Sequence, residues 1–211
     1  MGKRQIFELK ILGINPFLIS AAVVVSFGLL AYIGGELLNL SYMGFEVILP
    51  FYSAIAVSEW VKVRTDTNYD IIAAQGKSLF AWILRRFLTL FCIVALFALL
   101  GAVTVSLIRG EMPWHEMLFL YFAPAFFLST ISILCSFLFR HEHISILICG
   151  VIWLLTMLTR SMLRYPGYQY VYLFIRFAGD QNDIWLANKF ILTGISLILW
   201  VFIYFLCRKK M

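Results

Sequence analysis

Hydrophobic residues in this chain form long unbroken runs, and most charged residues lie in the stretches between them. A helical crossing of the bilayer's hydrocarbon core takes about 20 apolar residues, and six runs approach or exceed this length. The runs span about residues 16–34, 45–61, 87–108, 117–139, 144–162 and 190–207. They do not alternate between apolar and polar positions as the strands of a membrane barrel do. The pattern therefore predicts an all-α polytopic membrane protein with six transmembrane helices.

Glycines and prolines predict where these helices end and bend. Gly34 and Gly35 end the first run, and the helical pattern of the third run reaches back to Leu79. Pro50 and Pro124 fall inside the second and fourth runs. Because proline donates no backbone hydrogen bond, a kink is expected in each of these two helices.

The composition excludes a soluble protein. Apolar residues make up 63% of the chain and charged residues 13%, whereas a soluble domain has about 25% charged residues. Six crossings use most of the 211 residues. We therefore expect a single transmembrane domain over residues 1–211, and size alone excludes a built-in nucleotide-binding, protease or receptor domain.

The positions of the cations predict the orientation, because cytoplasmic loops of membrane proteins are enriched in lysine and arginine. With the N-terminus inside, the cytoplasmic set holds twelve of the 17 cations: Lys3, Arg4, Lys10, Lys62, Arg64, Lys77, Arg85, Arg86, Arg140, Arg208, Lys209 and Lys210. The outer set is Arg109, Arg160, Arg164, Arg176 and Lys189. Both termini are therefore predicted to face the cytoplasm.

Other features agree with a protein that stays in the membrane. No small-residue cleavage site follows the charged start, so the first run is interpreted as a retained span and not as a signal peptide. The net charge of +6 is assigned to the loops, and no nucleic-acid partner is expected. The four cysteines lack paired spacing and are interpreted as small buried hydrophobic residues: Cys92, Cys135, Cys149 and Cys207.

Two connections are too long to be simple turns: a cytoplasmic one between spans two and three, and an outer one over about residues 163–189. In the cytoplasmic connection, Thr67 and Asp70 have capping-box spacing. A short helix is therefore expected over about residues 67–76, with Gly76 ending it in the left-handed conformation. Ile71 and Ile72 lie on this helix among charged residues. It could dock in a groove on a soluble partner, or it could be an ordinary interfacial helix.

With this connection and six spans, the chain resembles the membrane permease subunit of a type II ABC exporter, a bacterial six-span family. The resemblance covers nearly the whole chain. It includes the charged segment before span one, both termini inside, the cytoplasmic connection that starts with Glu59 and Arg64, the basic pair Arg85 and Arg86, and the long outer connection.

The resemblance implies a partnership. It makes the short helix a coupling helix that seats in a cleft of a separate ABC ATPase, which would carry the ATP and Mg. The residues expected to take part in this coupling are Glu59, Arg64, Thr67, Asp70, Ile71, Ile72 and Gly76. It also implies a second permease subunit, a pathway lined by spans one, two and five, short re-entrant helices in the outer connection, and a bacterial inner (plasma) membrane.

Three other motifs in the chain carry alternative interpretations. Gly76-Lys77-Ser78 resembles the end of a phosphate-binding loop, but Ile71 stands where the first glycine is needed, so no ATP site is expected in this chain. His141 and His143 are two residues apart, which is not the spacing of a zinc helix, so no metal is expected. The serines of the spans lack the context of a hydrolase nucleophile, so an enzyme is not expected.

The acidic residues fall in or near the outer loops, and Glu46 and Arg160 are expected to reach the interface near the ends of their spans. Since few charges lie inside the spans, a dedicated proton relay is not expected. The pathway would suit a hydrophobic or amphipathic cargo, with an antimicrobial or similar peptide as the preferred candidate. The alternatives are the six-span substrate-capturing subunit of a vitamin importer, with Ala21, Ala22 and Gly28 as small docking residues, and a non-transport membrane assembly protein.

Overall fold

The computed structural model describes residues 15–61, 79–110, 112–139, 141, 143–176 and 184–209. Within these ranges the chain forms helices and short turns, without strands. The helices are α2 (Asn15–Ile33), α3 (Glu36–Met43), α4 (Leu49–Trp60), α6 (Leu79–Arg109), α7 (Trp114–Leu138), α8 (Ile144–Leu158), α9 (Pro166–Gln169) and α10 (Ile184–Lys209). A π-helical turn, Gly44–Ile48, joins α3 to α4, and a 3-10 helix, Thr159–Arg164, follows α8.

Six helical stretches are long and apolar enough to cross a membrane, so the predicted fold class is confirmed. They are Asn15–Ile33, Leu37–Trp60, Leu79–Arg109, Trp114–Leu138, Ile144–Arg164 and Ile184–Arg208. The second and sixth stretches begin earlier than the expected 45 and 190. The reason is that polar residues in the added turns are accommodated by the bundle and do not end the helices: Ser41 donates to the Phe27 carbonyl, and Asn188 and Lys189 are buried.

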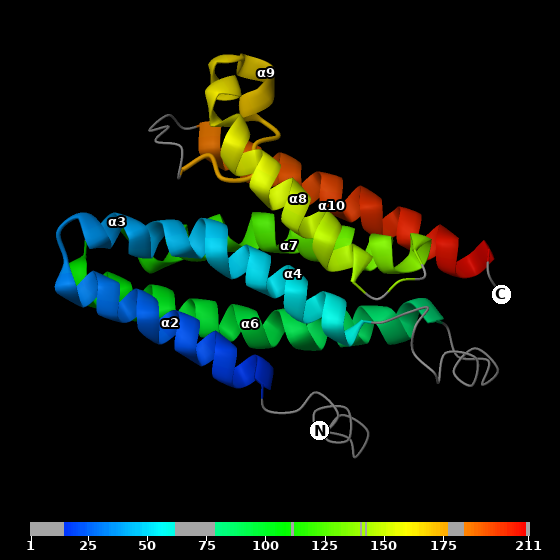
Figure 1. The fold of residues 1–211 in the computed structure, drawn as a ribbon, viewed down its shortest axis with the longest axis horizontal. Helices are drawn as coiled ribbons and strands as arrows, with labels where there is room; N and C mark the ends of the chain where they lie inside the picture. Colours follow the sequence, from blue (N-terminus) through cyan, green and yellow to red (C-terminus); the bar gives the residue numbers. More distant parts are fainter. Residues whose placement is uncertain are drawn as a thin grey trace.

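Successive spans run in opposite directions through an elongated bundle (Figure 1). We call the end where α4 ends and α6 begins the Trp60 end, and the end where α2 and α6 finish the Gly34 end. The start of α2 and the end of α10 lie at the Trp60 end, while α9 lies at the Gly34 end. The charge distribution predicts that the Trp60 end faces the cytoplasm.

Helix α7 is the centre of the bundle, since it contacts α4, α6, α8 and α10. Of the 18 most apolar consecutive residues of α7, 61% are buried. The corresponding share is 17% in α2 and 6% in the stretch Ile144–Arg164, which contains α8. The closest packing partners are α2 with α6 and α4 with α7, and each pair runs parallel (Figure 1). Neighbours in space are therefore often separated by another span in sequence.

Aromatic rings fill much of the larger hydrophobic core. Phe87 on α6 packs against Phe91, Phe126 and Trp200, with centroids 5.3, 5.9 and 4.9 Å away. These rings come from α6, α7 and α10 and lock the three helices together, because each aromatic pair adds about 0.5–1.5 kcal/mol beyond its buried area.

Helix α6 carries an arginine contact near each of its ends. It has 31 residues, a length of about 46 Å, which exceeds the roughly 30 Å hydrocarbon core. Arg109 donates from Nε to the Ala31 carbonyl at 2.8 Å and from a terminal nitrogen to the Tyr32 carbonyl at 3.0 Å. Arg86 donates to the Trp60 carbonyl at 3.3 Å. Each arginine thus serves carbonyls that the last turn of a neighbouring helix leaves without a partner.

The turn between α2 and α3 depends on two glycines. Gly34 and Gly35 have φ angles of 77° and 63°, in the left-handed region that other residues rarely adopt. A Cβ on Gly34 would also clash with the guanidinium of Arg109, whereas one on Gly35 would meet nothing. Gly34 therefore leaves room for Arg109 to reach the end of α2.

The prolines and cysteines differ in part from expectation. The irregularity near Pro50 takes the form of the π-helical turn just before it, and Pro124 lies inside α7. Cys135, Cys149 and Cys207 are buried as expected, but the expectation was wrong for Cys92, which is exposed. Cys92 lies on a part of α6 that no other helix covers, a position that the run of apolar residues alone could not identify.

Candidate functional site

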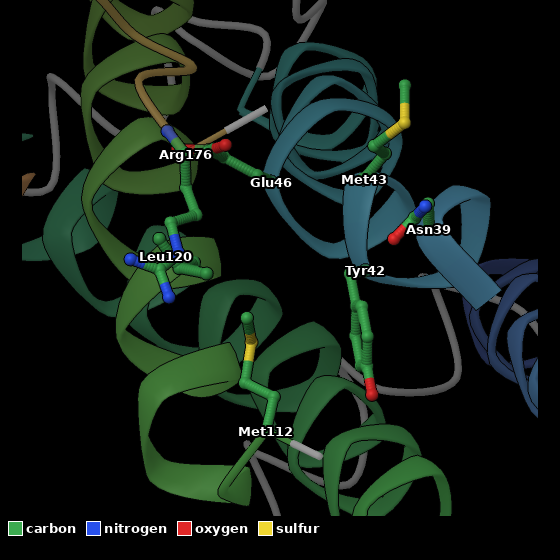
Figure 2. Close-up of a pocket in the computed structure, with 7 residues that line it drawn as sticks. All are labelled: Asn39, Tyr42, Met43, Glu46, Met112, Leu120 and Arg176. Atoms are coloured by element: carbon green, nitrogen blue, oxygen red, sulfur yellow. The ribbon is translucent and has the colours of Figure 1, made fainter. Parts of the chain in front are cut away.

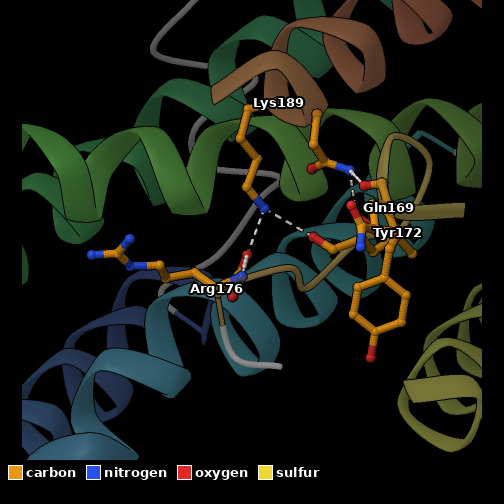
Figure 3. A network of polar contacts seen from close by, with 7 residues as sticks. Gln169, Tyr172, Arg176 and Lys189 are labelled. Carbon is orange, nitrogen blue, oxygen red and sulfur yellow. Dashed lines mark hydrogen bonds and ion pairs between the residues drawn. The ribbon is translucent and has the colours of Figure 1, made fainter. Parts of the chain in front are cut away.

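A buried ion pair joins the second and sixth spans near the Gly34 end. Nζ of Lys189 lies 2.6 Å from Oε1 of Glu46, and the two side chains are 0% and 2% exposed. Lys189 also donates to the Leu173 carbonyl at 2.9 Å, and the Arg176 amide donates to Oε1 of Glu46 at 3.3 Å (Figure 3). Charged groups within membrane-spanning helices are costly and commonly mark functional positions. This cluster is therefore the first candidate site.

The local sequence explains how Glu46 enters the bundle. It lies in the π-helical turn Gly44–Ile48, and such turns insert one extra residue and are frequent at functional sites. Gly44 allows the turn to approach α2 closely, since a Cβ there would collide with the ring of Phe27. The Val47 carbonyl accepts a hydrogen bond from the Trp153 indole at 3.0 Å. The turn is thus held against α2 on one side and α8 on the other.

Helix α10 fixes the segment 169–176 through two adjacent residues. Nδ2 of Asn188 donates to the carbonyls of Gln169 and Tyr172, both at 2.8 Å, and Lys189 reaches the Leu173 carbonyl. Both side chains are fully buried. Because buried backbone carbonyls need partners, these contacts account for the way in which this connection folds back onto the bundle.

Tyr172 in this segment is held in its neutral form. Its side chain is buried and packs against the ring of Tyr168, with centroids 5.7 Å apart. Burial raises the pKa of Tyr172 to about 12, and the nearby Tyr168 and the charge of Glu46 act in the same direction. Tyr172 therefore contributes no charge to the cluster near neutral pH.

A cavity of about 350 Å³ lies beside the ion pair. It is lined by Asn39, Tyr42, Met43, Glu46, Met112, Leu120 and Arg176 (Figure 2). The lining residues come from α3, the π-helical turn, the bend before α7, α7 itself and the segment 169–176. The cavity is of the size that small-molecule sites occupy.

The sequence-based placement of Glu46 and Lys189 was wrong. Glu46 was expected to reach the membrane interface and Lys189 to belong to the outer connection, but the structure buries both inside the bundle. The missed signal is the apolar stretch Ile184-Trp185-Leu186-Ala187 before Lys189. This stretch makes α10 begin at Ile184, before Lys189. The lysine therefore lies within the helix, where its side chain meets the carboxylate of Glu46.

The predicted coupling site lies at the opposite end of the bundle. Glu59 is an exposed residue in the last turn of α4. The remaining predicted coupling residues lie outside the described residues: Arg64, Thr67, Asp70, Ile71, Ile72 and Gly76. The short helix over about 67–76 therefore stays a prediction.

The helices that flank this connection are fixed to each other. Arg86 on α6 donates to the Trp60 carbonyl and lies 4.0 Å from the ring centroid of Trp82 and 5.8 Å from that of Trp60. Stacking of a guanidinium on indole rings adds a cation–π attraction of about 0.5–1 kcal/mol or more per contact. The connection 62–78 thus leaves and rejoins the bundle at two helix ends that Arg86 holds together.

A second cavity, of about 340 Å³, lies between α2 and α4 at the Trp60 end, and both Glu59 and Trp60 line it. Here the Tyr52 hydroxyl donates to the Pro16 carbonyl at 2.9 Å, and the Ser20 hydroxyl donates to the same carbonyl at 2.7 Å. Pro16 is the second residue of α2. Because its carbonyl accepts a hydrogen bond from Tyr52 of α4, it ties α2 to α4 beside Glu59, one of the predicted coupling residues.

The histidine pair lies in the turn that precedes α8. His141 and His143 are both exposed there. Among the residues that the structure describes, no group of three or more His, Cys, Asp or Glu side chains is placed to hold a metal ion.

Comparison with models of protein families, with curated proteins and with solved structures gives no match for this chain. Function must therefore be argued from the topology and from the two ends of the bundle.

Proposed function

We propose that this chain is the membrane permease half of an ATP-driven ABC exporter. Two permease subunits, identical or homologous, would form the pathway, and separate ATPase subunits would bind ATP and Mg. The observation that carries this proposal is the arrangement at the Trp60 end. The connection 62–78 begins and ends on α4 and α6, two spans that Arg86 joins by a hydrogen bond and by stacking.

This arrangement suits the transmission of force from a cytoplasmic partner. A push on the connection would act on α4 and α6 together, because Arg86 couples their ends. Helix α4 packs most extensively on α7, which in turn contacts α8 and α10. Closure of the ATPases could therefore rock the whole subunit, since packed helices transmit displacement as rigid elements.

The exposure of the spans supports the expected pairing of two permeases. The resemblance places spans one and five near the subunit interface. These are the two least buried of the six spans: only 17% and 6% of the residues in their most apolar stretches are buried. Helix α8 exposes Leu147, Val151, Leu154 and Leu158 along its length. A partner subunit could cover this apolar surface by close packing, which drives the association of helices within lipid.

The proposed pathway is poor in charge. Within α2 and α8 no residue is charged. The second span, Leu37–Trp60, carries Glu59 and Glu46, and Lys189 pairs with Glu46, while Arg160 and Arg164 lie at the end of the fifth span, after α8. Such walls suit a hydrophobic or amphipathic cargo, and an antimicrobial or similar peptide remains the preferred candidate. By contrast, Gly28, one of the small residues that favoured a vitamin-capturing subunit, lies against Thr104 of α6 and not on the free face of α2.

The proposal is tested by substituting the apolar residues of the predicted coupling helix. Ile71→Asp and Ile72→Asp put a charge into the proposed groove contact, where desolvation is costly. The protein should still insert, while co-purification of the ATPase and cargo-stimulated ATP hydrolysis should fall together. Gln181→Ala in the outer connection serves as the control and should change neither.

Three outcomes would weigh against the proposal. Full ATPase association and transport by the Ile71 and Ile72 variants would contradict the coupling assignment and favour the vitamin-capturing or assembly alternatives. Micromolar ATP binding to the purified chain, lost on changing Lys77, would show a nucleotide site of its own. A purified complex without any ATPase subunit would favour the assembly alternative.

A further inference from the structure

Among the residues that the structure describes, the cavity at the Gly34 end holds one cation without a carboxylate partner. Glu46 forms an ion pair with Lys189, at 2.6 Å. The guanidinium of Arg176, which also lines this cavity, points away from Lys189 (Figure 3). No ion pair joins it to a described carboxylate. Within the described part of the chain, Arg176 is therefore the charged group that is available to a ligand.

The surroundings of Arg176 leave its hydrogen-bonding edge available. Its guanidinium lies over the indole ring of Trp185, whose centroid is 5.8 Å away, and it has no hydrogen bond to another described side chain. Stacking leaves the five N–H donors of an arginine in their planar fork, which matches the oxygens of a phosphate. Trp185 thus orients the group without using its donors.

The rest of the lining combines polar groups with an apolar wall. Asn39 supplies an amide, and Tyr42 extends toward Met112 across the cavity (Figure 2). Met43, Met112 and Leu120 supply flexible or aliphatic surface. In addition, Pro124 cannot donate the usual helical hydrogen bond to the Leu120 carbonyl. A ligand with a charged, hydrogen-bonding headgroup and an apolar tail would match both the polar groups and the apolar wall of this cavity.

We propose that this cavity binds the phosphate group of an anionic lipid, with Arg176 as the main contact. The position at one end of a membrane-spanning bundle places the site where lipid headgroups lie. A guanidinium recognises the oxygens of such a phosphate through its paired N–H donors. The volume of about 350 Å³ accommodates a headgroup and the beginning of its acyl chains. The inference does not depend on the proposed export function.

The test measures lipid binding to the full purified chain by native mass spectrometry. Phosphatidylglycerol should bind at least about tenfold more tightly than zwitterionic phosphatidylcholine. Arg176→Gln should remove most of this preference, and Arg176→Lys should retain part of it, because lysine keeps the charge but loses the fork. Arg164→Gln is the matched control, since Arg164 is an exposed cation at the same end of the bundle.

A second variant separates the cavity from the charge. Met112→Trp keeps Arg176 but fills the cavity, and it should weaken phosphatidylglycerol binding about as much as Arg176→Gln does. Inorganic phosphate identifies the source of the recognised group: competition at millimolar concentration supports a site for phosphate itself, and absence of competition supports a site for the intact lipid. Equal binding of the two lipids, or equal losses in the Arg176→Gln and Arg164→Gln proteins, would overturn the proposal.

Discussion

The two ends of the bundle hold their charged residues by different contacts. At the Gly34 end, Glu46 and Lys189 form a buried ion pair. At the Trp60 end, Arg86 bonds a backbone carbonyl and stacks on indole rings. Arginines of α6 thus bond backbone carbonyls at both ends, and the Gly34 end is held in addition by a buried ion pair.

This difference sharpens the predicted orientation. Lys189 was counted among the five outer cations, but it lies inside the protein with its charge compensated. Removing it leaves four outer cations against twelve on the other side. Because only cations near loop and span ends orient a membrane protein, the structure increases the asymmetry on which the topology prediction rests.

The most decisive test of this comparison is an all-or-none labelling experiment. In a variant without the native cysteines, Tyr165→Cys should react with an impermeant maleimide on intact cells, because Tyr165 is 69% exposed at the Gly34 end. Lys77→Cys should react only after the membrane is opened. Labelling of position 77 from outside would reverse the assignment of both ends.

The next largest effect is expected from breaking the buried pair. Glu46→Gln leaves Lys189 charged without a carboxylate, which should lower the free energy of unfolding by about 3–5 kcal/mol. The double variant Glu46→Gln with Lys189→Met should recover part of this loss, because neither charge remains. Unfolding measured in mixed micelles checks both values. A loss below about 0.5 kcal/mol in the single variant would contradict the role of the pair.

A smaller effect is expected where Arg109 meets Gly34. Gly34→Ala and Gly35→Ala should each cost about 1–2 kcal/mol of backbone strain. Gly34→Ala should cost about 1.5–3 kcal/mol more, since the added methyl displaces the charged hydrogen bonds of Arg109. In an Arg109→Ala background the difference between the two glycine variants should vanish. If it persists, the arginine does not account for the need for glycine at position 34.

The smallest effect is expected at the Trp60 end. Arg86→Lys keeps the charge but loses the planar stack on Trp82, which lies 4.0 Å away. A loss of about 1 kcal/mol in the free energy of unfolding is expected. Arg208→Lys, at an exposed position of the same end, should change it by less than about 0.5 kcal/mol. Equal losses in the two variants would show that the stack contributes nothing measurable.

Much of the fold could be predicted because lipid imposes a simple rule on the sequence. A span must be long, apolar and helical, so the six crossings follow from the runs of apolar residues. The start of α6 at Leu79 was predicted from the same pattern. The runs of apolar residues do not indicate which spans contact each other. The parallel packing of α4 on α7 could therefore not be predicted from the sequence.

The cluster at the Gly34 end could not be assembled from the sequence for a related reason. Glu46 and Lys189 are 143 residues apart, and each alone looks like a charge near the end of a span. Only the π-helical turn and the early start of α10 bring them together. In the sequence, Arg109 is only an outer cation and Gly34 only a predicted helix end. The packing of α2 on α6 brings the two residues into contact.

The separation of Glu46 from Lys189 has a consequence for how the protein is made. Ribosomes add roughly 5–20 residues per second, so the 143 residues between the two take about 7 to 29 seconds to synthesise. During that interval the second span is complete while its counter-ion does not yet exist. Until then the carboxylate lacks the partner that it has in the finished bundle, and an unpaired charge within a span is costly. Assembly of this bundle is therefore finished only when the last span arrives and delivers its lysine.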